Sequence, residues 1–259
     1  MDHVVNFSSS LLFMPLETVY TSIMEVQFGV AKVSKYATRE SGDTLEMIER
    51  PHGGLSIVLV DGQRSGKSAK AISNVVARKA IQLLAEGVRD GAAARAAHDY
   101  LYTYRKGKVS ATLNILSVDT VTKTFVVSRN NEAPVIVFTH KKGLHLLDDP
   151  SCSVGVQRNT KPVISEIPIT VGTLIVVFTD GLRHAGSLSG TNCYDPHEAT
   201  RLMLERGIDN AQIIADTLLD QAVAMDSGRP RDDISVLVIS VKENIINNQV
   251  RRLQGTIPI

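Results

Sequence analysis

Acidic residues stand beside strongly apolar segments at several points of the chain. Asp61 follows the run LSIVLV, Asp180 follows TLIVVF and one threonine, and Asp232 and Asp233 precede ISVLVISV. Asp43, within Ser-Gly-Asp, precedes another apolar segment. A single Asp-Gly pair is an ordinary turn signal, but several acids at the ends of buried strands are costlier to place.

Carboxylates gathered at strand ends repel one another and need compensating cations. Hard divalent ions supply that compensation through oxygen ligands. Gly62, directly after Asp61, leaves its backbone carbonyl open to an ion because no side chain stands in the way. Two such ions about 4 Å apart hold a phosphoryl group and lower the pKa of a shared water. The pattern favours metal-assisted chemistry, although spacing alone names no reaction.

The elements that carry these acids follow from hydrophobic periodicity. Strands are predicted at residues 24–33, 44–49, 55–60, 111–118, 124–128, 134–139, 143–147, 163–169, 173–178 and 234–241. Helices are predicted at residues 69–86, 92–104, 197–205 and 210–225. Neighbouring strands joined by short turns favour antiparallel pairing. We therefore expect an α+β fold in which two packed antiparallel sheets, a β-sandwich, are flanked by helix pairs.

Composition limits the classes of partner. The 259 residues carry a formal charge of +1 with 43% hydrophobic content, which is ordinary for a globular protein and argues against a nucleic-acid partner. Two cysteines exclude a disulfide framework. No basic leader and no apolar run of about 20 residues is present, so we expect a soluble cytoplasmic protein with no membrane partner. Residues 1–22 and 243–259 are expected to be extensions of a domain at 23–242.

Two other motifs suggest different chemistry. Residues 62–68 (GQRSGKS) resemble a nucleotide-binding P-loop, but three residues separate the glycines where that loop needs four. Cys152 and Arg158 have the Cys-x5-Arg spacing of tyrosine phosphatases, but Pro162 disfavours the helix that would activate the thiolate. The histidines form no recognisable metal-ligand spacing, and no GxSxG motif is present.

Four motifs together resemble those of a known family. They are GD at 42–43, VDG at 60–62, FTDGL at 178–182 and RDDISVLVI at 231–239, in that order. The chain is similar in this respect to the PPM family of metal-dependent protein phosphatases, and most to its bacterial SpoIIE/RsbX-type branch. The likeness runs from about residue 23 to 242 and includes SATLNILSVD and the asparagine-rich segment before APVIV. It implies a two-sheet β-sandwich with a two-metal site between the sheets.

By position, the resemblance assigns the site residues. Asp61 would bridge both ions, and the Gly62 carbonyl would bind one of them. Asp180 and Asp232 would complete the ligands of the first ion, so that Asp61, Asp180 and Asp232 are the expected catalytic set. Asp43 would serve the second ion, directly or through water.

Four further residues lie close to these motifs. The eukaryotic branch of the family holds the substrate phosphate with an arginine before its first acidic motif, and Arg39 is the candidate for that substrate-binding role here. Asp233 is expected to turn the chain or to support the ligands. Arg183 and His184 stand where many relatives carry an acid, and a surface loop is the simpler interpretation of this pair.

The resemblance implies hydrolysis of phosphoserine or phosphothreonine on a protein. A hydroxide held between two Mn²⁺ or Mg²⁺ ions would attack phosphorus in line. The expected substrate is a bacterial regulatory protein, a phosphorylated STAS-domain component of a partner-switching or stress-response circuit. The alternatives are a catalytically silent phosphatase-like binding module, against which the four intact acids argue, and a P-loop nucleotide-binding protein.

Overall fold

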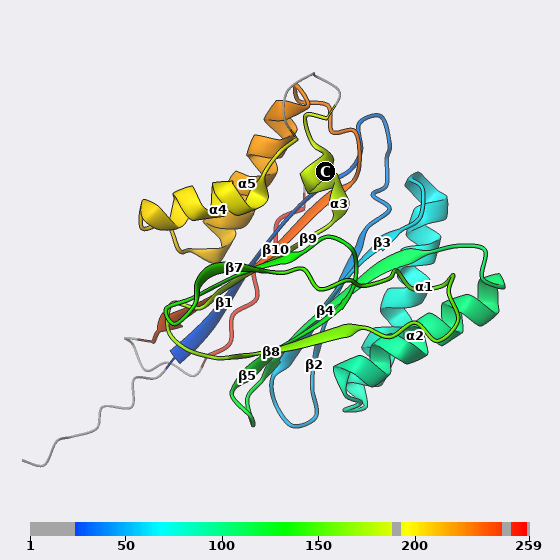
Figure 1. Ribbon diagram of the computed structural model, residues 1–259, viewed down its shortest axis with the longest axis horizontal. Helices are drawn as coiled ribbons and strands as arrows, with labels where there is room; N and C mark the ends of the chain where they lie inside the picture. Colours follow the sequence, from blue (N-terminus) through cyan, green and yellow to red (C-terminus); the bar gives the residue numbers. More distant parts are fainter. Residues whose placement is uncertain (1–23, 188–192, 245–249, 258–259) are drawn as a thin grey trace, which may run out of the picture.

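Two five-stranded antiparallel sheets pack face to face in the computed structural model, which describes residues 24–187, 193–244 and 250–257. One sheet has the order β1-β10-β9-β6-β7 and the other the order β2-β3-β4-β5-β8. Helices α4 and α5 cover the outer face of the first sheet, and α1 and α2 cover that of the second (Figure 1). The strands are β1 Met24–Val33, β2 Thr44–Glu49, β3 Leu55–Gly62, β4 Ala111–Asp119, β5 Thr124–Asn130, β6 Val135–Thr139, β7 Gly143–Leu147, β8 Val163–Pro168, β9 Leu174–Phe178 and β10 Ile234–Glu243. The helices are α1 Gly66–Ala85, α2 Asp90–Arg105, α3 Asp180–His184, α4 Pro196–Glu205 and α5 Ala211–Met225.

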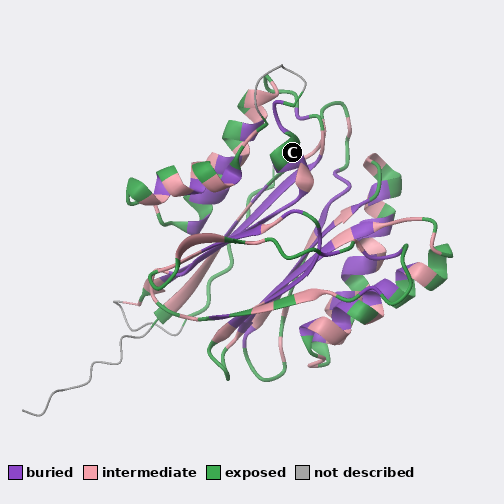
Figure 2. Cartoon of the chain, viewed as in Figure 1, coloured by how far each residue is buried: buried purple, intermediate pink, exposed green. Residues whose placement is uncertain are grey.

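The strands are apolar on both faces because each sheet is buried on both sides. In β3, Ile57 and Leu59 pack against the other sheet, while Val58 and Val60 pack against α1 and α2. In β9, Val177 lies between the sheets and Val176 lies under α5. Figure 2 shows the result, with the inner strands and the inward faces of the helices buried and the outer helix faces exposed. This double burial explains why the apolar runs were continuous rather than alternating.

The fold class predicted from the sequence is confirmed: the sheets are antiparallel and helix pairs flank them. Each predicted strand and helix is present, with ends that differ by a few residues. The main differences are that β3 continues through Gly62 and that α1 begins at Gly66 instead of residue 69. The short helix α3 was not predicted, because five residues are too few for a helical period to show. Arg183 and His184 therefore lie in the last turn of α3 and not in a loop.

The two expected extensions are described only in part. Residues 1–22 lie outside the described residues. In the C-terminal segment, Arg251 Nη1 donates a hydrogen bond of 3.0 Å to Glu49 Oε1 of β2. The boundaries of a domain at 23–242 thus stay a prediction. No helix within the described ranges is long and apolar enough to cross a membrane.

Candidate functional site

Three of the predicted ligands line a single polar pocket of about 420 Å³. Asp61 is near the end of β3, Asp180 is the first residue of α3, and Asp232 lies two residues before β10. Gly62 also lines the pocket. The antiparallel order brings these strand ends to one edge of the sandwich, where α3 lies (Figure 1). Residues that are far apart in the sequence therefore meet as the motif pattern predicted.

Asp43, the fourth acid among the predicted ligands, is fully buried just before β2. Its Oδ2 accepts hydrogen bonds from Ser235 Oγ at 2.6 Å and from Thr179 Oγ1 at 3.0 Å. Its Oδ1 is buried and has no hydrogen-bond partner. A buried carboxylate oxygen without a donor is costly, and a cation is the partner that would compensate it.

Burial and neighbouring charges shift the pKa values of three of these acids. Burial, followed by the charges of Asp43, Asp180 and Asp232, raises the pKa of Asp61 to about 9. Burial also raises the pKa of Asp43 to about 6, against the hydrogen bonds from Ser235 and Thr179, which lower it. The pKa of Asp232 is raised as well, mainly by burial. The cluster cannot carry its full negative charge at neutral pH unless a cation lies nearby.

The donor set fits a hard divalent cation. The ligand atoms would be carboxylate oxygens and the Gly62 carbonyl, which are the ligands that Mg²⁺ and Mn²⁺ prefer. No three acidic, histidine or cysteine side chains in the described part of the chain are already close enough together to hold an ion. The proposed ligand set also includes a backbone carbonyl, that of Gly62. Because two acids come from each sheet, an ion bound here would join the sheets.

Glycine follows two of the ligands for a steric reason. A Cβ atom on Gly62 would lie 2.1 Å from the backbone oxygen of Ala69 in α1. A Cβ atom on Gly181, next to Asp180, would lie 2.2 Å from the backbone oxygen of Asp233. Both distances are far below van der Waals contact, so any side chain would push the adjoining segment away. Close packing, in addition to access for an ion, therefore requires these glycines.

Asp233 faces away from the pocket and holds the loop between β1 and β2. Its carboxylate is buried and accepts hydrogen bonds from the backbone amide of Lys35 at 3.0 Å and from that of Gly42 at 2.8 Å. Neighbouring aspartates thus have separate tasks, since Asp232 lines the pocket while Asp233 orders a loop. The supporting role expected for Asp233 agrees with these contacts.

Two cations line the pocket, and the sequence did not single out either of them. Lys35 comes from the loop after β1, and Arg64 comes from the connection between β3 and α1. Arg39, the residue predicted to bind phosphate, is exposed and is not among the residues that line the pocket. Its assignment stays a prediction. The only sequence signal for Lys35 was its place between a strand and the Gly-Asp motif.

Of the other candidates, only His184 lies close to a predicted ligand. His184 Nδ1 is 3.9 Å from Asp180 Oδ2, and both side chains are largely exposed. Cys152 is exposed, and no helix follows it, so the cradle that a cysteine phosphatase needs is missing there. A P-loop follows a strand of a parallel sheet, whereas β3 pairs antiparallel with both of its neighbours.

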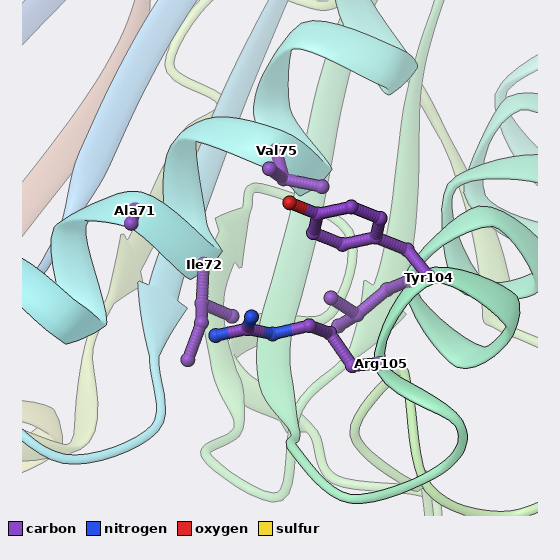
Figure 3. Close-up of a pocket in the computed structure, with 6 residues that line it drawn as sticks. Ala71, Ile72, Val75, Tyr104 and Arg105 are labelled. Atoms are coloured by element: carbon purple, nitrogen blue, oxygen red, sulfur yellow. The ribbon is translucent and has the colours of Figure 1, made fainter.

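A smaller cleft of about 80 Å³ lies between α1 and α2 (Figure 3). Ala71, Ile72 and Val75 of α1 form one side of it, and Tyr104 and Arg105 of α2 extend across it. It contains no acid and lies outside the aspartate pocket, so it offers no metal ligands.

A two-sheet sandwich with acids from both sheets at one edge is the architecture of PP2C-type phosphatase domains. The model of the family described as Stage II sporulation protein E (SpoIIE) matches residues 51–242. The chain belongs to the SpoIIE family, and the resemblance inferred from its motifs is confirmed.

Individual relatives are distant. Stage II sporulation protein E of Bacillus subtilis (strain 168) is 20% identical over 228 residues, which are 86% of this chain and 27% of that protein. This chain therefore spans about a quarter of that relative's length.

Solved structures share the fold. The phosphatase domain of Bacillus subtilis SpoIIE with a fragment of its regulatory domain has a TM-score of 0.68 at 18% identity, covering 85% of this chain and 64% of that one. The catalytic domain of the phosphatase PstP in complex with 2 manganese ions has a TM-score of 0.61 at 15% identity, covering 85% and 100%. RsbX in complex with magnesium has a TM-score of 0.62 at 14% identity, covering 84% and 96%.

Proposed function

We propose that this chain is a metal-dependent protein serine/threonine phosphatase. The observation that carries the proposal is the convergence of Asp61, Asp180 and Asp232 on one pocket, with the unpaired oxygen of Asp43 buried nearby. Four carboxylates in this arrangement destabilise the folded protein unless cations offset their charge. Phosphoryl hydrolysis with two oxygen-ligated ions is the chemistry that uses them.

The proposed ligands form two sets, one for each ion. Asp61, Asp180, Asp232 and the Gly62 carbonyl would hold one ion, and Asp61 with Asp43 would hold a second. Ions bound there would supply an activated water and offset the charge that develops on the phosphoryl group. Thr179 and Ser235 would keep Asp43 in position through their hydroxyl hydrogen bonds. No cysteine takes part, because Cys152 does not line the pocket.

The identity of the metal is part of the proposal. Mn²⁺ and Mg²⁺ fit an all-oxygen site, and the similar folds of PstP and RsbX contain manganese and magnesium respectively. A count of two ions rests on Asp43, whose charge acts on Asp61 but which does not line the pocket.

For the substrate, we propose phosphoserine or phosphothreonine on a regulatory protein of the STAS-domain class. The support is the likeness to RsbX in fold and to the SpoIIE family in sequence. The pocket supports a protein substrate, because it is polar and open and is lined by small side chains such as Ser65, Ser110 and Ser153. A cytoplasmic location stays a prediction, which the two unpaired cysteines, Cys152 and Cys193, favour.

The test measures phosphate release from a panel of phosphorylated STAS-domain proteins and from a phosphoserine peptide, with Mn²⁺ and then with excess chelator. We expect turnover with the metal and none with the chelator. Cys152→Ser should retain nearly full activity, while Asp180→Asn should lose at least a hundredfold. Binding of the phosphoproteins without turnover in any metal would indicate the silent binding module instead.

A further inference from the structure

The aspartate pocket needs a positive charge of its own to receive a phosphate ester. A phosphoserine carries about two negative charges at neutral pH and would enter a pocket lined by three aspartates. We propose that Lys35 is the side chain that holds the substrate phosphate. The proposal rests on the phosphatase function above and adds a substrate-binding residue that the motifs did not indicate.

Lys35 is held firmly by its backbone. Its amide donates to Asp233 Oδ1 at 3.0 Å, and its carbonyl accepts hydrogen bonds from the amide and the hydroxyl of Thr38. The next residue, Tyr36, donates its amide to the carbonyl of Pro230 at 2.7 Å. The loop is thereby fixed on the segment that carries Asp232, so the base of the Lys35 side chain keeps a constant position relative to a proposed metal ligand.

The Lys35 ammonium is available to a ligand. The residue is partly exposed and lines the pocket. Among the described residues, no acceptor lies within hydrogen-bonding distance of its Nζ. It lines the same pocket as Asp61, Asp180 and Asp232. A lysine is suited to this task because its three N–H donors rotate freely to meet phosphate oxygens.

The other nearby cations are less suitable. Lys32 and Lys70 both donate to the backbone oxygen of Asp43, at 2.6 and 2.7 Å, and do not line the pocket. Arg64 is exposed and has a left-handed backbone with φ of 80°, so it lies at the rim. Arg39 is exposed and outside the pocket lining. It is the competing candidate from the same loop, so the Arg39 and Lys35 variants are compared directly.

Binding of inorganic phosphate to the Mn²⁺-loaded protein, measured by calorimetry, tests the assignment directly. We expect Lys35→Ala to weaken phosphate binding at least tenfold and Lys35→Arg to restore part of the loss. Arg39→Ala should bind phosphate within twofold of the wild type. Mn²⁺ affinity, measured separately, should be unchanged in all three variants, which distinguishes loss of a phosphate contact from damage to the metal site.

Kinetics on a phosphoserine peptide provide a second readout. Lys35→Ala should raise KM at least tenfold with a smaller change in kcat. Asp233→Ala, which removes the acceptor of the Lys35 amide, should raise KM less than Lys35→Ala does. Asp233→Asn should recover part of the rise in KM that Asp233→Ala causes. Phosphate binding by Lys35→Ala within twofold of the wild type would overturn the inference. If the wild type binds phosphate through Lys35 but hydrolyses no phosphopeptide, the proposed function fails and the assignment of Lys35 stands.

Discussion

The backbone oxygen of Ala69 in α1 lies directly against Gly62, where a Cβ atom would come within 2.1 Å of it. Gly42 meets the same residue, since its Cβ would lie 2.7 Å from the Cβ of Ala69. These glycines adjoin the proposed ligands Asp61 and Asp43. One residue of α1 therefore contacts both segments that carry acids of the second sheet.

Replacing Gly62 by alanine should disturb this contact. We expect Gly62→Ala to lower the free energy of unfolding by about 2–3 kcal/mol, because the new methyl group meets backbone atoms that cannot rotate away. Mn²⁺ affinity should fall as well, since the Gly62 carbonyl and Asp61 move with the strand end. Urea unfolding and calorimetry measure the two effects.

Gly91→Ala is the matched control. Gly91 lies within α2, and its added Cβ would only touch the side chain of Ile164 at 3.4 Å. Alanine there should be neutral or stabilise by up to about 1 kcal/mol through helix propensity. A Gly62→Ala protein as stable as the wild type would contradict the packing argument.

The position of α1 should affect metal binding. Ser73 Oγ donates to the carbonyl of Gly42 at 2.5 Å, and Lys70 Nζ donates to that of Asp43 at 2.7 Å, so α1 is bonded to the Gly-Asp motif. Val76 is fully buried one turn further along. Val76→Trp should cost about 1–3 kcal/mol by overpacking and should weaken Mn²⁺ binding in the folded fraction.

A control for Val76→Trp comes from the other helix layer. Leu218 of α5 is also fully buried, but it packs under the first sheet. Leu218→Trp should lower stability without a comparable loss of Mn²⁺ affinity. Equal metal affinity in the folded fractions of both variants would mean that α1 is only a scaffold.

Charge removal at the centre of the cluster should have opposite effects with and without metal. In metal-free protein at neutral pH, the raised pKa of Asp61 means that folding must add a proton to this carboxyl. Asp61→Asn removes that cost, and we expect Tm to rise by about 2–4 °C, the shift that about 1 kcal/mol gives in a domain of this size. In the wild type, Mn²⁺ should raise Tm, and in Asp61→Asn it should not. Thermal scans with chelator and with Mn²⁺ measure both. A large metal-dependent rise in Tm in the variant would remove Asp61 from the ligand set.

Folding stability should depend on His98 below neutral pH. Its side chain is almost fully buried, and its Nδ1 accepts a hydrogen bond from the amide of Gly155 at 3.0 Å. Burial lowers the pKa of His98 below its usual 6.5, although Asp99 partly opposes this. The unfolded chain thus binds the proton more readily, so stability is full above about pH 6.5 and is lost as the pH falls towards the folded-state pKa.

The comparison with His98→Gln isolates this contribution from that of the aspartates. The stability advantage of the wild type over His98→Gln should shrink as the pH falls from 7.5 to 5.5, at a slope of at most about 1.4 kcal/mol per pH unit. Urea unfolding at several pH values measures the difference. A constant difference across this range would mean that His98 does not change its charge there.

Much of the fold was predictable because local sequence determines it. The apolar runs around Leu59 and Val177 identify buried strands, and the acids beside them follow from the motif order. The proximity of Asp180 and Asp232 follows once β9 and β10 pair antiparallel. The addition of Asp61, which comes from the other sheet, rested on the resemblance to the family.

The parts that were missed depend on contacts distant in sequence. Helix α3 is too short to show a period. Lys35 lines the pocket, and its amide is held by Asp233, 198 positions away. The need for glycine at position 62 depends on the approach of Ala69, which no local pattern records. Loop cations and close backbone contacts of this kind become visible only in three dimensions.

The sharing of the aspartates between the two sheets has a consequence for the amount of folded protein. The first proposed ion, held by Asp61 from one sheet and by Asp180 and Asp232 from the other, would bind only while the sheets are together. Folding and metal occupancy would then be linked, and an ion at a hundred times its dissociation constant would add about 2.7 kcal/mol to the free energy of unfolding. A cell short of manganese or magnesium would hold fewer intact copies of the protein, in addition to leaving the remaining copies inactive.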